Sequence, residues 1–237
     1  MKSRDWQRAR TEDQVEQRVR EIQDAAARLI KTLPYDKVTL LRIAQELDFT
    51  RSNVYRYFST KEEIFLSMYV ADMRRWSEDI EREFNKPLSI EDFTEKWTQI
   101  LCRQEQLLEL SPLLAVTLER NTSEEAFRKT KLFLVELLFR VVGILRKALP
   151  MLSDEQIVEF IRTQQVLFSG AWPMSRLPER QKEILRELNI EYMILDFPAF
   201  FRDTILRLLK SLAEENLPTP GKSGHRKRTG RNLKVEP

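Results

Sequence analysis

Apolar residues recur at three- and four-residue intervals along almost the whole chain, and this spacing constrains the fold more than any other feature. No convincing run of alternating apolar and polar residues interrupts it, so strands are not expected. The sequence also has only five glycines among 237 residues, too few for the many tight turns of a sheet protein. We therefore predict an all-α fold.

Prolines and capping residues divide this pattern into separate helices. A first helix over 15–33 ends at Pro34, because proline interrupts a helix. The other predicted helices are 39–47, 51–58, 60–84, 89–110, a short one after Pro112, 122–149, 153–170, 179–188 and 198–215. Four long helices are expected to begin at a Ser or Thr cap that is followed, three residues later, by an acidic or amide side chain. These caps are Thr60, Ser89, Thr122 and Ser153.

The residue inventory excludes several classes of enzyme. The chain has one histidine, His225, which lies in the polar tail, and one cysteine, Cys102, so we exclude a histidine-centred triad, a metal site of several histidines and an internal disulfide. No glycine-rich phosphate loop is present. We therefore expect a protein that is not an enzyme and that needs no cofactor or metal. With no apolar stretch of ~18 residues and no signal peptide, we also expect no membrane partner and a cytoplasmic location.

Basic residues gather at the two ends of a chain whose formal net charge is only +3. Residues 1–12 are predicted to form a mobile basic arm, which could reach a DNA minor groove. Residues 218–237 are predicted to form a disordered basic tail, with six Lys or Arg residues and no acidic residue over 222–234. A polyanionic partner and simple solubilisation both remain open for the tail.

The most informative segment is Val38–Lys61, VTLLRIAQELDFTRSNVYRYFSTK. It predicts two short helices joined by a tight turn, with Thr39 capping the first and Thr50 capping the second. The small side chain of Ala44 lets such helices cross closely. This is the plan of a helix-turn-helix, whose second helix enters the major groove. We interpret residues 13–60 as a three-helix DNA-binding domain.

At these residues the sequence resembles the tetracycline-repressor (TetR) family. The matching positions are Thr39, Ile43-Ala44, Asp48-Phe49, Thr50, Tyr55-Arg56-Tyr57-Phe58 and Lys61. Weaker resemblance over 118–134 and 167–178 points to the C-terminal domain of one TetR subgroup. The resemblance implies that residues 61–217 form a helical ligand-binding and dimerisation domain.

Two positions depart from the family pattern. Asp48 stands where the family usually has glycine, and aspartate tolerates the left-handed backbone that such a turn requires. Ser52-Asn53 replaces the common Gly-Thr pair. The second change leaves the fold intact and the target DNA sequence open.

The recognition helix is expected to divide its residues between DNA and the domain core. Val54 and Phe58 must point inward, which turns Arg51 toward DNA. Arginine pairs bidentately with guanine, so we expect Arg51 to read a base, supported by Ser52 and Asn53. The resemblance implies phosphate contacts from Thr39, Thr50, Tyr55, Tyr57 and Lys61. Core packing of the tyrosines and a solvated Lys61 are the alternatives.

A short recognition helix contacts few base pairs, so specificity requires a two-fold homodimer on a palindromic operator. By analogy with the family, the helices at 153–169 and 198–215 would form a four-helix interface. The candidate interface residues are Phe160, Val166, Leu167, Phe200, Ile205 and Leu208. Some of them are expected to be core residues of one chain.

Aromatic side chains in the middle helices suggest a pocket for a hydrophobic or amphipathic small-molecule effector. The candidate ligand-binding residues are Trp97, Phe127, Phe133, Phe168 and Trp172. Simple core filling explains these aromatics equally well.

Our leading hypothesis is a ligand-responsive dimeric repressor that binds double-stranded DNA. A regulator without an effector, or an activator, would have the same sequence features. A helical enzyme with an incidental helix-turn-helix lacks an identifiable acid–base pair. A helical adaptor without DNA contact would show no salt-dependent duplex binding.

Overall fold

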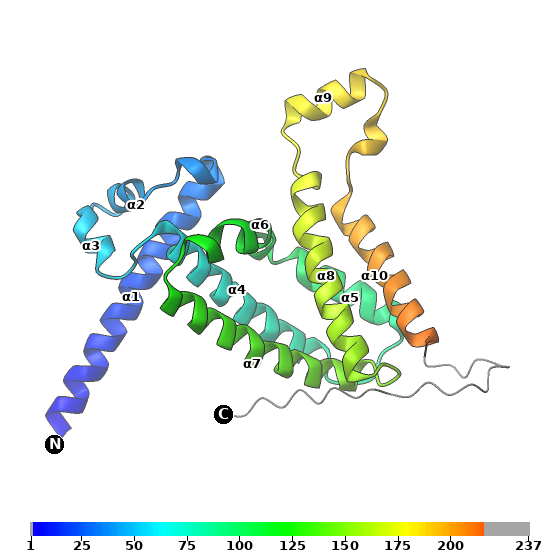
Figure 1. Cartoon of the computed structure of the whole chain (residues 1–237), viewed down its shortest axis with the longest axis horizontal. Helices are drawn as coiled ribbons and strands as arrows, with labels where there is room; N and C mark the ends of the chain where they lie inside the picture. Colours follow the sequence, from blue (N-terminus) through cyan, green and yellow to red (C-terminus); the bar gives the residue numbers. More distant parts are fainter. Residues whose placement is uncertain (1, 216–237) are drawn as a thin grey trace.

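The structure is a computed structural model that describes the backbone of residues 2–215 and the side chains of residues 13–215. Within this part the chain forms ten α-helices with short 3₁₀ and π segments, and no strand (Figure 1). The predicted all-α fold is confirmed. The predicted tail 218–237 lies outside the described residues. The backbone of the predicted arm continues the first helix, α1 (Lys2–Thr32).

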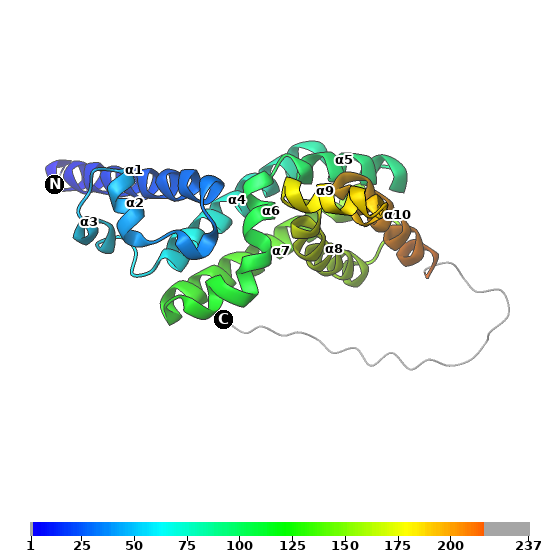
Figure 2. The ribbon, with the colours of Figure 1, turned by 90° about the horizontal axis from the view of Figure 1, so that it is seen from above.

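Three helices form a lobe at one end of the molecule, joined to the rest by α4 (Figure 2). These are α1, α2 (Leu40–Glu46) and α3 (Arg51–Tyr55). Helix α4 (Lys61–Glu83) packs against α1 and continues into the larger body, where it packs against α5, α6 and α7. One helix is therefore shared by the lobe and the body.

The body is a bundle of α4 with five further helices and a peripheral arm. The five helices are α5 (Ile90–Cys102), α6 (Glu105–Leu113), α7 (Glu124–Ala148), α8 (Asp154–Ser175) and α10 (Phe197–Glu214). Helix α10 packs against α5 and α8, and α6 packs against α4 and α8. The centre is an aromatic cluster around Trp97, whose ring centroid lies 5.2–5.6 Å from those of Trp76, Phe84, Phe93 and Phe160.

Most predicted helix starts agree with the observed caps. Thr60, Ser89 and Ser153 each accept a hydrogen bond from a backbone N–H three residues later, and Ser153 with Gln156 forms a complete capping box. The predicted cap of α7 was wrong. Ser123, one residue after Thr122, accepts from the amide of Ala126 and begins that helix.

Three other boundaries also differ from the prediction. The helix predicted over 89–110 is divided at Arg103-Gln104 into α5 and α6. Pro112 lies inside the last turn of α6 and is followed by a π-helix, Leu114–Leu118, and a 3₁₀ turn, Glu119–Asn121. Helix α8 passes Gly170 and includes Pro173 near its end.

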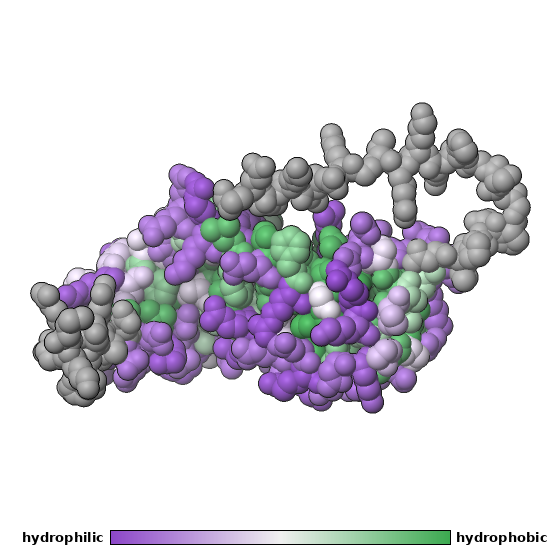
Figure 3. All heavy atoms as spheres, turned by 90° about the horizontal axis from the view of Figure 1, so that it is seen from below, coloured by the Kyte–Doolittle hydropathy of each residue, from purple (hydrophilic) through white to green (hydrophobic). Residues whose placement is uncertain are grey.

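Helix α9 (Glu179–Glu187) and the 3₁₀ turn Glu191–Met193 project beyond the ends of α8 and α10 (Figure 1). No residue of this arm is buried. On the opposite side of the body lies α7, whose exposed residues include Leu132, Val135 and Phe139, and apolar atoms are visible among charged ones on that face (Figure 3). None of the helices in residues 2–215 combines the length and apolarity needed to cross a membrane.

Candidate nucleic-acid interface

The turn between α2 and α3 has the geometry of a helix-turn-helix. Thr39 caps α2, because its hydroxyl accepts from the amide of Arg42 at 3.2 Å. Asp48 adopts a φ of 52°, the left-handed conformation expected at this position. The chain then folds back so that the amide of Phe49 donates to the carbonyl of Ala44 at 2.9 Å. The turn therefore forms around a non-glycine residue.

The lobe buries one side of α3 and exposes the other. Val54 is fully buried and Phe58 is 8% exposed, and both belong to the core with Ile43 and Ala44. Arg51 and the other residues of α3 besides Val54 lie at the surface. The predicted inward and outward faces of the recognition helix are therefore observed.

The outward face is organised by a contact between two predicted DNA-binding residues. Arg51 donates from Nη2 to the Tyr55 hydroxyl at 2.6 Å, and its guanidinium lies 5.1 Å from the centroid of the Tyr55 ring. Ser52 and Asn53 are exposed beside them. Arg51 is thus held along the helix, next to the tyrosine expected to contact a phosphate.

Thr50 does not cap α3 with its side chain, which corrects the sequence prediction. Its hydroxyl instead lies 3.2 Å from the hydroxyl of Ser52. Helix α3 also ends at Tyr55, earlier than predicted, so Tyr57 and Phe58 lie in the following turn. Tyr57 is half-buried against the core.

Lys61 contacts a residue that the sequence analysis did not single out. Its ammonium donates to the carbonyl oxygen of Tyr35 at 2.8 Å and lies 4.2 Å from the centroid of that ring. The Tyr35 hydroxyl in turn donates to Glu62 at 3.0 Å. Burial and the charge of Glu62 raise the pKa of Tyr35, so its hydroxyl stays protonated. No local sequence signal marks Tyr35 as a partner of Lys61, because the two are 26 positions apart.

Four of the predicted DNA-binding residues surround one hollow of about 480 Å³ on the surface of the lobe: Thr39, Arg51, Tyr55 and Lys61. The other four, Thr50, Ser52, Asn53 and Tyr57, lie outside its lining. The hollow combines two cations with several hydroxyl donors, and it also contains the carboxylate of Glu62, which accepts from the Tyr35 hydroxyl. The cations and hydroxyls suit an oxyanion such as a backbone phosphate.

Comparison with known families agrees with this geometry. A model described as bacterial regulatory proteins of the tetR family matches residues 22–68, and a model of the tetracyclin repressor-like C-terminal domain matches residues 70–214. The chain belongs to the TetR family. It is therefore a DNA-binding transcriptional regulator, in which the lobe is the TetR helix-turn-helix domain.

Two solved structures share the fold. The fatty acid degradation regulator FadR from Bacillus halodurans has a TM-score of 0.50 and 16% identity, over 79% of this chain and 94% of that chain. The transcriptional regulator FadR from Bacillus subtilis, solved with stearoyl-CoA, has a TM-score of 0.52 and 20% identity, over 80% and 96%. At these identities the likeness concerns the fold alone. No curated protein matches the sequence significantly.

In the TetR-type C-terminal domain, the five aromatic residues predicted to bind a ligand do not surround one cavity. Trp97, Phe168 and Trp172 are buried at 1–7% exposure. Phe133 is half-buried under the guanidinium of Arg74, and Phe127 is exposed beneath the ammonium of Lys131. Trp97 is the centre of the aromatic core, so its bulk serves packing.

A different set of residues lines an open apolar cavity of about 270 Å³ between α4, α7 and α8. Most of the lining is aliphatic, including Leu134, Leu138 and Ile161, and the polar members include Lys131 and Gln165. Trp76 lines it too, and its buried indole N–H has no hydrogen-bond partner among residues 13–215. Aliphatic residues at helical spacing look the same whether they line a cavity or fill a core, so the sequence could not reveal this site.

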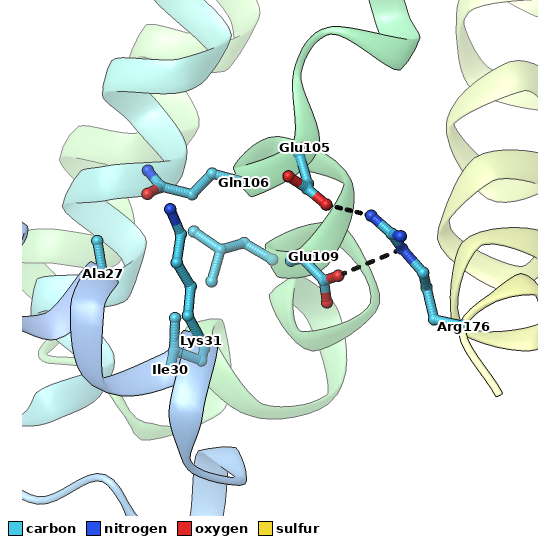
Figure 4. A pocket seen from close by; sticks show the side chains of 8 residues that line it. Ala27, Ile30, Lys31, Glu105, Gln106, Glu109 and Arg176 are labelled. Atoms are coloured by element: carbon cyan, nitrogen blue, oxygen red, sulfur yellow. Dashed lines mark hydrogen bonds and ion pairs between the residues drawn. The ribbon is translucent and has the colours of Figure 1, made fainter. Parts of the chain in front are cut away.

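A second hollow, of about 490 Å³, separates α1 from α6 and the end of α8 (Figure 4). Glu105 and Glu109 on α6 point toward Arg176, which pairs with both, and Lys31 of α1 lies opposite (Figure 4). The Arg176 guanidinium also lies 4.3 Å from the centroid of the Trp172 ring. The charged lining does not suit an apolar ligand. Instead, the ion pairs of Arg176 with Glu105 and Glu109 connect the end of α8 to α6.

Proposed function

We propose that this TetR-family regulator is a dimeric, ligand-responsive repressor that binds a palindromic operator. The observation that carries the proposal is the left-handed turn at Asp48 with Val54 and Phe58 buried behind it. This arrangement presents Arg51 and Tyr55 on the outer face of the recognition helix. The apolar cavity between α4, α7 and α8 supports the response to a ligand.

We assign the reading of base edges to Arg51, with Ser52 and Asn53 in support. Arginine can donate two hydrogen bonds to guanine in the major groove. Because Arg51 donates to the Tyr55 oxygen, the Tyr55 hydroxyl proton remains free to bond a phosphate. One side chain of this pair would read sequence while the other fixes register.

We assign phosphate contacts to Thr39, Thr50, Tyr55, Tyr57 and Lys61. The hydroxyl of Thr50 is not used as a helix cap, so it is available to an external oxyanion. Lys61 has three donors, and the bond to Tyr35 uses one of them. The ammonium can therefore hold a phosphate while it keeps its contact with Tyr35.

We propose a dimer interface built on the exposed faces of α8 and α10. Val166 is 70% exposed and Phe200 is 38% exposed, whereas Phe160 and Ile205 are fully buried and belong to the core of one chain. Leu167 and Leu208 are half-buried. Gly170 is exposed on the same helix as Val166, so a larger side chain there would enter the proposed interface.

The dimer face can be tested with two matched glycines. Gly143 on α7 is also inside a helix, and a Cβ at either glycine would meet open space. We expect Gly170→Leu to shift the protein toward monomer in sedimentation at micromolar concentration, whereas Gly143→Leu stays dimeric. A dimer that survives Gly170→Leu and dissociates with Gly143→Leu would move the interface to α7.

For the effector we propose an amphipathic molecule with a slender apolar chain, such as a long-chain acyl-CoA. The cavity of about 270 Å³ is open and lined mostly by aliphatic side chains, which suits an apolar chain that extends beyond it. Lys131 would lie close to a polar or anionic head group. The stearoyl-CoA in the Bacillus subtilis FadR structure is the same class of molecule.

The proposed function is tested by binding of fluorescent duplexes. An operator selected from a random pool should bind roughly 10³-fold or more tightly than random DNA, and both affinities should fall with salt. Stearoyl-CoA should weaken operator binding at least about tenfold, about 1.4 kcal/mol of coupling. Equal affinity for selected and random duplexes would refute a sequence-specific repressor, and an unchanged operator affinity with stearoyl-CoA would refute this effector class.

A further inference from the structure

The carboxylate of Glu63, near the start of α4, connects two turns that are far apart in the sequence. Its Oε2 accepts from the backbone amide of Ser59 at 2.8 Å, and its Oε1 accepts from the amide of Ser123, 60 positions later, at 3.3 Å. The hydroxyl of Thr60 donates to the carbonyl of Asn121 at 3.3 Å. We call these three contacts the Glu63 bridge. The bridge connects the turn after the recognition helix, at Ser59, to the turn before α7, at Ser123.

Capping of α4 does not require the contact with Ser123. The cap itself is the bond from the amide of Glu63 to the Thr60 hydroxyl, at 3.2 Å. Burial raises the pKa of Glu63, but the hydrogen bonds from Ser123, Ser59 and Thr60 outweigh it and hold the pKa below its ordinary value. The group is therefore a carboxylate at neutral pH, the stronger form of acceptor.

The other end of the bridge leads to the apolar cavity. Helix α7 begins just after Ser123 and supplies several of the residues that line the cavity, such as Leu138. Lys131, also in the lining, pairs with Glu119 at 2.6 Å. Glu119 is only two residues before Asn121. Two structural connections therefore run from the cavity to the bridge, one along α7 and one through the Lys131–Glu119 pair.

The segment between the cavity and the bridge departs from regular helix. Leu114 lines the cavity and begins the π-helix, and the 3₁₀ turn Glu119–Asn121 follows directly. Such segments are uncommon, and they frequently occur at functional sites or hinges. The segment between the cavity and the bridge therefore has the backbone geometry that is often found at hinges.

We propose that Glu63 is a positioning residue that transmits the state of the apolar cavity to the recognition helix through the N-terminus of α7. The proposal rests on the proposed ligand response and names its route. The competing route runs through α6, which is held to α4 where buried Asp72 accepts from Gln106 at 2.8 Å. The two routes use different residues, so substitution can separate them.

Position 123 allows one contact of the bridge, the amide bond from Ser123 to Glu63, to be removed with a matched control. Ser123 has a φ of −66°, which proline adopts without strain. Ser123→Pro removes the amide donor to Glu63 and the side-chain hydroxyl, whereas Ser123→Ala removes only the hydroxyl, which caps α7 and also lowers the pKa of Glu63. The difference between the two variants therefore reports the amide bond to Glu63.

A substitution in the cavity stands in for the effector, so the test does not depend on its identity. Leu138→Trp places a larger side chain in the lining. Each of the wild type, Ser123→Ala and Ser123→Pro is prepared as the full chain with and without Leu138→Trp. Amide hydrogen exchange of residues 50–60 is then measured by mass spectrometry without DNA, and thermal unfolding is measured in parallel.

We expect Leu138→Trp to change exchange of residues 50–60 at least threefold in the wild type and in Ser123→Ala, and less than 1.5-fold in Ser123→Pro. An equal change in all three backgrounds would assign the signal to another route, such as α6, and overturn the proposal. No change in the wild type would overturn it as well. If Ser123→Pro unfolds at the assay temperature, Glu63→Gln replaces it, and the same outcomes decide.

This result is independent of the outcome for the proposed function. Failure to bind an operator would show in the duplex titrations, whereas the exchange experiment contains no DNA. A protein that binds an operator but shows no bridge-dependent exchange would keep the proposed function and lose the route through Glu63.

Discussion

Replacing Arg51 with alanine tests the division between base reading and phosphate binding. Arg51 is exposed, and its described side-chain contact is with Tyr55, so removing it should change the free energy of unfolding by less than about 0.5 kcal/mol. A bidentate arginine–guanine contact provides about 1–3 kcal/mol of discrimination. To pair with guanine, Arg51 must give up its hydrogen bond to Tyr55, which costs roughly 0.5–1.5 kcal/mol. We therefore expect a loss of about 1–2 kcal/mol per half-site.

Two half-sites together give about 2–4 kcal/mol, a loss on the order of 30-fold to 10³-fold for the operator. The assay is a titration of operator and random duplexes across a salt series. Random DNA should lose much less affinity, and selectivity should relax at one base position per half-site. In contrast, Lys61→Ala should weaken both duplexes alike and reduce the salt slope by about one per subunit. Equal loss on both duplexes for Arg51→Ala would refute the assignment.

Three further predictions concern stability. Asp48→Gly should raise the free energy of unfolding by about 0.5–1 kcal/mol in urea titrations, because the φ of 52° favours glycine; a lower value would contradict this. Because the pKa of Glu63 is lower in the folded state, its carboxylate stabilises the fold at pH values above its ordinary pKa of 4.5. This stabilisation disappears as the pH falls through the folded pKa. Acid titrations of Glu63→Gln should therefore show a shallower stability loss below about pH 5, and an unchanged slope would argue against it. Trp97→Phe should lower the free energy of unfolding by more than about 1 kcal/mol and leave the affinity for stearoyl-CoA unchanged, because Trp97 is a core residue. Weaker stearoyl-CoA binding with unchanged stability would instead indicate that Trp97 contacts the effector.

The helix-turn-helix was predictable because its constraints are local. Thr39 caps α2 from the first turn, Asp48 needs only its own backbone conformation, and Val54 and Phe58 follow the helical period. Each of these features lies within a few residues of its cause. The exposure of Arg51, Ser52, Asn53 and Tyr55 was therefore predictable from the sequence, whereas Tyr57 packs partly against the core.

The features that were missed depend on contacts between distant residues. Lys61 meets Tyr35 across 26 positions and Glu63 meets Ser123 across 60, and no local pattern encodes either pair. The division of α5 from α6 falls at Arg103-Gln104, without a proline or glycine to mark it. Thr122 and Ser123 are adjacent residues that can both cap a helix, and Ser123, whose amide also bonds Glu63, is the cap in the structure.

The short recognition helix also affects how the target of such a regulator can change over generations. Its buried residue is Val54, while Arg51, Ser52 and Asn53 are exposed and contribute little to the stability of the lobe. Substitutions at these three positions can therefore alter the preferred DNA sequence without a cost in folding. A duplicated copy of the gene could acquire a new set of target promoters while keeping the same apolar cavity between α4, α7 and α8.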